Sequence, residues 1–219
     1  MTGLRHTALV ALALLAVAPA ARAAPPPAPL AVSLAARGGR VVATLDLSSA
    51  FPTTIERDLG NGLTNVVAVY VTLTPDAGGD PTALFGRVIE ILFDVWEETY
   101  AVTVKDPQRP EGVRLVLRDF AALRRFLAME HDVDLGPVSA LPEGPFHVDA
   151  RVEVNPVSKE QLQRTREYIA NPAAGTRTAG GTRSVLGAMA SFLLREPDAG
   201  SDVHLLRSRS FRAREVAVR

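Results

Sequence analysis

Residues 146–155 read FHVDARVEVN, and this stretch decides the fold. Apolar and polar residues alternate along it without a break, which is the period-2 pattern of a β-strand. The apolar residues, expected to face the core, are Phe146, Val148, Ala150, Val152 and Val154. The polar residues, expected to face solvent or another layer, are His147, Asp149, Arg151, Glu153 and Asn155. Such alternation is typical of antiparallel sheets with one face on the core.

Earlier stretches repeat this pattern. Residues 30–36 and 40–47 alternate on either side of Arg37-Gly38-Gly39, which predicts a hairpin. Residues 64–74 carry valines at alternate positions and predict another strand. Residues 89–95 and 100–104 both alternate, but with opposite parity, and a regular strand cannot change parity. We therefore expect a bulge or tight turn near Glu97-Glu98.

Helices are predicted between the strands. Thr53 and Glu56 have capping-box spacing, and Asp119 precedes an apolar stripe at Phe120, Leu123 and Leu127, with Glu130 facing outward. Residues 158–171 and 185–194 predict two more helices, whereas 131–145 reads as irregular. Residues 112–117 predict a short strand, and residues 203–218 predict one or two terminal strands or a frayed tail. The predicted class is α+β, mainly antiparallel β, as a sandwich or a curved sheet with about three inserted helices.

The N-terminus has the features of an export signal. Arg5 and His6 precede an apolar run from Ala8 to Ala18, and Ala21-Arg22-Ala23 is the small-x-small pattern of a cleavage site. Residues 1–23 are therefore predicted to be a signal peptide cut after Ala23. The alternative is a membrane anchor, but a membrane-spanning helix needs about 20 apolar residues, more than the run from Ala8 to Ala18 contains.

After cleavage, the expected location is periplasmic or secreted, with no integral membrane span. Residues 24–29 form a Pro-rich leader that is not expected to join a sheet. Residues 30–219 form a single β-rich domain with a mobile Gly/Ala/Thr-rich loop at 173–182.

Composition narrows the functional classes. The chain has no cysteine, which excludes disulfides, thiol catalysis and cysteine metal sites. Residues 24–157 carry 11 basic and 18 acidic side chains, a net of −7, whereas 158–219 carry 11 and 6, a net of +5. Such opposite charges attract each other or scatter over the surface, and with an export signal they do not favour nucleic acid as a partner.

The predicted polar strand face is the strongest chemical candidate. His147, Asp149, Arg151 and Glu153 combine acid, base and cation, a set that can transfer protons or hold a ligand. The alternative is a solvated sheet face. A hydrolase using His147 and Asp149 is a further hypothesis. The lack of a Gly-x-Ser-x-Gly elbow and of a persuasive serine partner argues against it.

Trp96 forms a second candidate with Tyr100, Glu97 and Glu98. Aromatic and acidic side chains at a bulge can line a binding groove. The alternative is an ordinary core tryptophan beside a turn.

Two loops resemble ligand sites only in part. Glu130, His131, Asp132 and Asp134 offer oxygen and nitrogen donors, but they match neither the EF-hand nor the His-Glu-x-x-His spacing. Residues 175–182 are rich in glycine but lack the Gly-Lys-Ser/Thr ending of a phosphate loop. We therefore expect no metal and no cofactor.

Scattered motifs run through most of the mature chain, roughly from Val41 to Phe211. They are Leu47-Ser48-Ser49-Ala50-Phe51-Pro52 with Thr54-Ile55-Glu56, Gly62-Leu63-Thr64-Asn65, Phe93-Asp94-Val95-Trp96-Glu97-Glu98, Asn155-Pro156-Val157-Ser158, Asn171-Pro172 and 186–192. This set resembles an uncharacterised family of exported bacterial proteins defined as a domain of unknown function. The resemblance implies a periplasmic or membrane-associated protein without assigned activity or catalytic residues. Some members are encoded beside sensor-kinase genes, which implies a signalling partner.

These observations favour a non-enzymatic periplasmic protein-interaction module that presents a sheet surface or edge to another envelope protein. The possible interaction surface comprises His147, Asp149, Arg151, Glu153, Trp96, Glu97 and Glu98. The alternative is a small-molecule or lipid-binding domain with a pocket near Trp96 and the 185–194 helix.

Overall fold

The computed structural model describes residues 26–156 and 202–218, which form mostly antiparallel β-sheets with few helices. The expected signal peptide, the helices at 158–171 and 185–194 and the loop at 173–182 lie outside these residues. Within the described part, no helix is long and apolar enough to cross a membrane.

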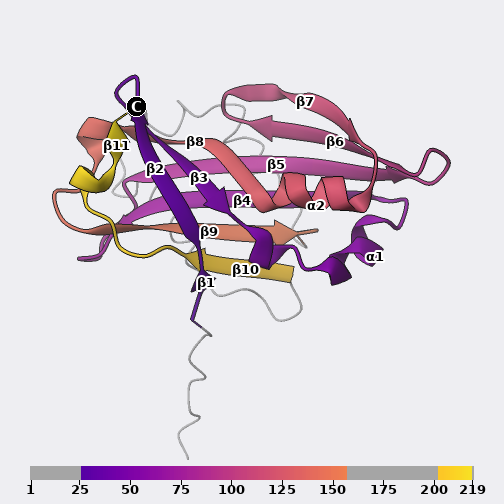
Figure 1. The fold of residues 1–219 in the computed structure, drawn as a ribbon, viewed down its shortest axis with the longest axis horizontal. Helices are drawn as coiled ribbons and strands as arrows, with labels where there is room; N and C mark the ends of the chain where they lie inside the picture. Colours follow the sequence, from indigo (N-terminus) through magenta and orange to yellow (C-terminus); the bar gives the residue numbers. More distant parts are fainter. Residues whose placement is uncertain (1–25, 157–201, 219) are drawn as a thin grey trace, which may run out of the picture.

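The larger sheet has seven strands in the order β1-β10-β9-β4-β5-β6-β7 (Figure 1). All its pairings are antiparallel except the short parallel pair β1–β10. Its strands are β1 (Ala28–Pro29), β4 (Thr64–Pro75), β5 (Ala83–Asp94), β6 (Thr99–Asp106), β7 (Arg109–Leu117), β9 (Phe146–Val154) and β10 (Asp202–Arg207).

The smaller sheet has four strands in the order β11-β2-β3-β8. They are β2 (Ala31–Arg37), β3 (Arg40–Asp46), β8 (Met129–Pro137) and β11 (Ala217–Val218). Strands β2, β3 and β8, together with helix α2 (Phe120–Ala128), lie over one face of the larger sheet (Figure 1). Apolar side chains of both sheets and of α2 share one buried cluster.

Alternation explains why these stretches pair as they do. The predicted apolar sides of residues 41–47 and 146–154 are buried almost completely. In β4 the side chains of both faces are buried, because Ala68 and Tyr70 are as inaccessible as Val67 and Val69. A central strand covered on both faces has no wet side, so β4 carries buried residues on both faces although its valines alternate.

One predicted helix cap is present in the structure and the other is not. The Asp119 side chain accepts a hydrogen bond from the Ala122 amide and caps α2 as predicted. The predicted capping box at Thr53 is wrong, because Thr53 itself begins a 3₁₀ turn and makes no capping hydrogen bond. The other helical elements of the described residues are α1 (Glu56–Leu59) and the 3₁₀ turns η1 (Ser48–Ala50), η2 (Thr53–Ile55), η3 (Val138–Ala140) and η5 (Ala213–Glu215).

Both predicted turns are confirmed. Arg37 pairs with Arg40 across Gly38-Gly39, whose φ angles of 54° and 76° suit glycine. The parity change corresponds to a tight turn between β5 and β6, where Glu98 has a φ of 52°.

Two expectations about strands are wrong. The Pro-rich leader does join a sheet, since Ala28 and Pro29 pair with Leu206 and Arg207. Pro29 is tolerated because β1 is an edge strand, where a missing N–H breaks no central ladder. Residues 129–137 form β8, although most of them lie in the stretch expected to be irregular.

Candidate functional site

The structure separates the predicted site residues along the larger sheet. His147 lies at the start of β9 and pairs with Thr74 near the end of β4. Trp96 follows β5, whose Ile91 pairs with Asn65 at the start of β4. The turn between β5 and β6 extends beyond one end of the sheet (Figure 1). The two predicted clusters therefore do not form one site.

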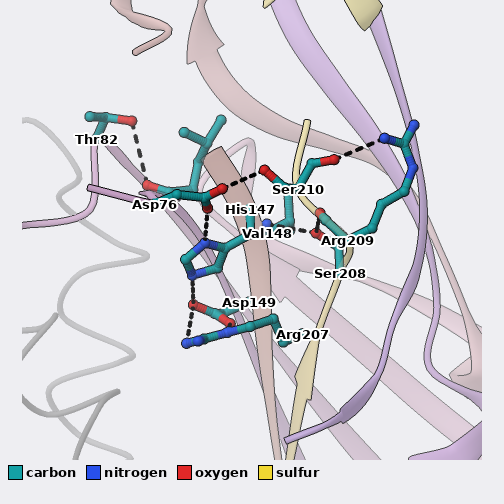
Figure 2. A network of polar contacts seen from close by, with 10 residues as sticks. Asp76, Thr82, His147, Val148, Asp149, Arg207, Ser208, Arg209 and Ser210 are labelled. Atoms are coloured by element: carbon teal, nitrogen blue, oxygen red, sulfur yellow. Dashed lines mark hydrogen bonds and ion pairs between the residues drawn. The ribbon is translucent and has the colours of Figure 1, made fainter. Parts of the chain in front are cut away.

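His147 connects a loop, a strand and the C-terminal segment (Figure 2). Its Nδ1 is 2.6 Å from Asp76 Oδ1, and the Ser210 hydroxyl donates to the other oxygen of Asp76. On the other side of the ring, Nε2 is 3.2 Å from Asp149 Oδ2. Arg207 Nε donates to Asp149 Oδ1 over 2.7 Å. We call His147, Asp76, Asp149, Arg207 and Ser210 the histidine cluster.

The geometry of the histidine cluster does not activate a nucleophile. Ser210 donates to Asp76 rather than to His147, so the imidazole does not accept the serine proton. Nε2 of His147 is buried and, despite its distance to Asp149, makes no well-aligned hydrogen bond. Hydrogen bonds from Ser210 and His147 lower the pKa of Asp76 and favour its charged form. The cluster links the loop at Asp76, strand β9 and the C-terminal segment by polar contacts.

Arg151 and Glu153 are not surface residues, which corrects the expected interaction surface. Their relative exposures are 6% and 2%, and Arg151 Nε donates to Glu153 Oε1 over 2.6 Å. Alternation placed both side chains on the polar face correctly, but this face is buried at the centre of the sheet. A buried charge requires a partner, and the two residues supply one for each other.

Trp96 is the most exposed large hydrophobic residue in the described part of the chain, at 91%. The alternative of an ordinary core tryptophan is therefore wrong. Asp94 Oδ1 accepts hydrogen bonds from the amides of Trp96 and Glu97, at 2.9 and 3.1 Å, and fixes the turn. Glu97 and Glu98 are exposed beside Trp96.

Further apolar side chains are exposed at the same end of the sheet. Leu63 directly precedes β4, and Leu92 pairs with Thr64 at the start of that strand. Val95 lies close to Gly62, since a Cβ atom added to Gly62 would be 3.4 Å from the Val95 side chain. Leu63, Leu92 and Val95 are 68%, 42% and 57% exposed. We call these three residues and Trp96 the end patch. Sequence reasoning missed Leu63 and Leu92, although an apolar residue beside a Gly-Asn-Gly turn is a usable signal.

A buried ionic cluster was also missed. Arg87 on β5 donates through Nη1 to Glu130 on β8, and through Nη2 to Asp106 at the end of β6, the latter over 3.0 Å. Arg109 also binds Asp106, at 3.1 Å. Burial raises the pKa of Glu130 from 4.5 to about 7, although the charge of Arg87 opposes this change. We call Arg87, Asp106, Arg109 and Glu130 the inter-sheet ion cluster.

The expected outward position of Glu130 at a solvated helix end is wrong, because its relative exposure is 2% and it lies in a strand. No three His, Asp or Glu side chains of residues 26–156 and 202–218 gather in a way that could hold a metal ion.

Comparison of the chain with protein-family models, with curated proteins and with solved structures gave no match. The functional argument therefore depends on the geometry and on the sequence itself.

Proposed function

We propose that the protein is a non-enzymatic protein-interaction module that binds its partner through the end patch. The observation that carries this proposal is the 91% exposure of Trp96 on a turn fixed by hydrogen bonds. Apolar side chains that cluster on a surface are typical of interaction sites, whereas single exposed ones are ordinary.

The turn offers an anchor residue at low entropic cost. Trp is enriched among the residues that dominate binding energy, and truncating such a residue costs about 2 kcal/mol or more. Asp94 holds the backbone of the turn in place before binding, so less freedom is lost on association. Neighbouring Leu63 and Val95 exclude water around a docked indole.

Charge defines the partner more closely. Glu97 and Glu98 are exposed next to Trp96, and Asp94 adds a third carboxylate to the same turn. The complementary surface is an apolar pocket bordered by lysine or arginine side chains. We therefore propose a protein partner of this kind rather than nucleic acid or an acidic surface.

The location of the partner depends on the predicted signal peptide at residues 1–23. Export would place the module in the periplasm or outside the cell, opposite an envelope protein. The resemblance to exported proteins encoded beside sensor-kinase genes supports a link to envelope signalling. Packing of the two sheets as a β-sandwich belongs to the same proposal, and their shared core supports it.

The test is purification of the protein from its own periplasm, with mass spectrometry of the proteins that travel with it. Trp96→Ala removes the anchor, and Val138→Ala is a matched control, because Val138 in η3 is 38% exposed and lies beside the Gly39 turn of the smaller sheet. We expect a stoichiometric partner with the unchanged protein and with Val138→Ala, but not with Trp96→Ala. A partner retained equally by both variants would contradict the proposal.

The alternative, a small-molecule or lipid-binding domain with its pocket near Trp96 and residues 185–194, remains a second proposal. A co-purified metabolite or lipid that is lost in Trp96→Ala, without any protein partner, would favour it. Reaction chemistry is not part of either proposal, since the histidine cluster activates no nucleophile.

A further inference from the structure

A pocket of about 410 Å³ lies beside the inter-sheet ion cluster and shares no residue with the end patch. Three arginines from three elements line it: Arg87 from β5, Arg109 at the start of β7, and Arg125 from α2. The volume falls within the range of about 300–1,000 Å³ that is typical of small-molecule sites.

Guanidinium groups outnumber the carboxylates that can neutralise them. Asp106 is shared between Arg87 and Arg109, and Glu130 binds Arg87 alone. Arg125 makes no hydrogen bond or ion pair with another residue in ranges 26–156 and 202–218. Asp132 also lines the pocket but pairs with Arg37 at 2.6 Å. The pocket is therefore suited to an added negative charge.

Arg87 has a donor that remains unsatisfied. Its side chain is 11% exposed, and its buried Nε has no hydrogen-bond partner. Buried donors without acceptors are rare in folded proteins and require an explanation. An anion bound in the pocket that Arg87 lines would supply the missing acceptor.

Part of the pocket lining is apolar. Phe126 of α2 and Met129 at the start of β8 line the pocket, and Met129 is 38% exposed. Inorganic anions gain nothing from such a surface, whereas an organic anion buries its apolar body there. The planar fork of arginine matches the two oxygens of a carboxylate.

We propose that this pocket binds a small organic carboxylate, with its charged group held by Arg109, Arg125 and Arg87 and its apolar body against Phe126 and Met129. This site is independent of the end patch, so its failure leaves the proposed interaction module untouched.

Binding at this site depends on pH through the inter-sheet ion cluster. Glu130 competes with the ligand for Arg87, and its other charged neighbours are Asp106 from β6 and Arg109 from β7. His131 and Asp132 of β8 line the same pocket. Protonation of Glu130 frees Nη1 of Arg87, so the carboxylate ligand binds more tightly as pH falls through the pKa of about 7.

Benzoate is a suitable probe because it joins a carboxylate to an apolar ring. We expect saturable shifts of the Arg109, Phe126 and Met129 amide signals in a ¹H–¹⁵N spectrum, with a Kd of about 1 mM. Arg125→Gln and Arg109→Gln each weaken binding by about tenfold, the value of one charged hydrogen bond. Arg114→Gln, an exposed change on the same strand as Arg109, leaves the Kd unchanged.

Two comparisons separate the parts of the proposal. Benzyl alcohol, which lacks the charge, and inorganic phosphate, which lacks the ring, are each expected to bind at least about tenfold more weakly than benzoate. Between about pH 8 and pH 6 the benzoate Kd falls by about threefold or more, and Glu130→Gln abolishes this change. Absence of saturable shifts, equal binding of phosphate, or an unchanged Kd in both arginine variants would overturn the proposal.

Discussion

Glu130 makes the stability of the fold depend on pH in a direction opposite to that of most carboxylates. Its pKa is about 7 in the folded chain, against 4.5 for an exposed glutamate. The folded state therefore binds more protons than the unfolded state between these pH values, and the free energy of unfolding falls as pH rises. The difference of about 2.5 corresponds to a loss of about 3 kcal/mol, complete above pH 7.

The Glu130→Gln variant tests this reasoning, because glutamine keeps an oxygen for Arg87 but does not titrate. Urea unfolding of both proteins is measured at several pH values from about 4 to 8. We expect the wild-type protein to lose about 3 kcal/mol relative to the variant over this range. Glu143→Gln, which removes an exposed carboxylate, is the control and keeps the wild-type slope. Parallel curves for the wild type and Glu130→Gln would refute the reasoning.

Three further changes test the other parts of the structure. Arg151→Ala leaves Glu153 buried without its ion pair and is expected to lower the free energy of unfolding by about 3 kcal/mol or more, measured by urea unfolding; exposed Arg114→Ala changes it by less than about 0.5 kcal/mol. Asp119→Ala removes the cap of α2 and costs about 1 kcal/mol in the same assay; no change would show that the cap does not stabilise the helix. Asp76→Asn reduces the fall of the melting temperature at acid pH. The lowered pKa of Asp76 adds stability at pH values above 3.8, the ordinary pKa of an aspartate, and this stability is lost as pH falls; the same fall in both proteins would contradict this.

Elements with unbroken alternation or local capping could be predicted from the sequence. Strand β9, the hairpin at Gly38-Gly39 and the cap at Asp119 all depend on residues close together in the chain. The turn near Glu98 was predictable for the same reason, since a parity change requires one.

Strand β8 was missed because its alternation is interrupted. Asp132 has a φ of 53°, and the pairing of β3 with β8 shifts between Val133 and Glu130. An inserted residue reverses the faces, so the apolar period disappears from the sequence although the strand persists.

The candidate sites depend on contacts between distant residues. Arg87 and Glu130 are 43 positions apart and meet only where the two sheets approach each other. The exposure of Trp96 and the burial of Arg151 likewise follow from which elements cover each face, and a period-2 pattern distinguishes faces without saying what lies above them.

The parallel pairs β1–β10 and β11–β2 connect the beginning of the described chain with its end, once in each sheet. A polypeptide that emerges from a ribosome or a translocation channel with its N-terminus first therefore holds β1 and β2 without these neighbours until residues 202–218 arrive. Contacts between such remote segments slow folding, because a long loop must close before they form. Completion of both sheets is thus coupled to the arrival of residues 202–218, and during that wait an edge of each sheet lacks its partner strand.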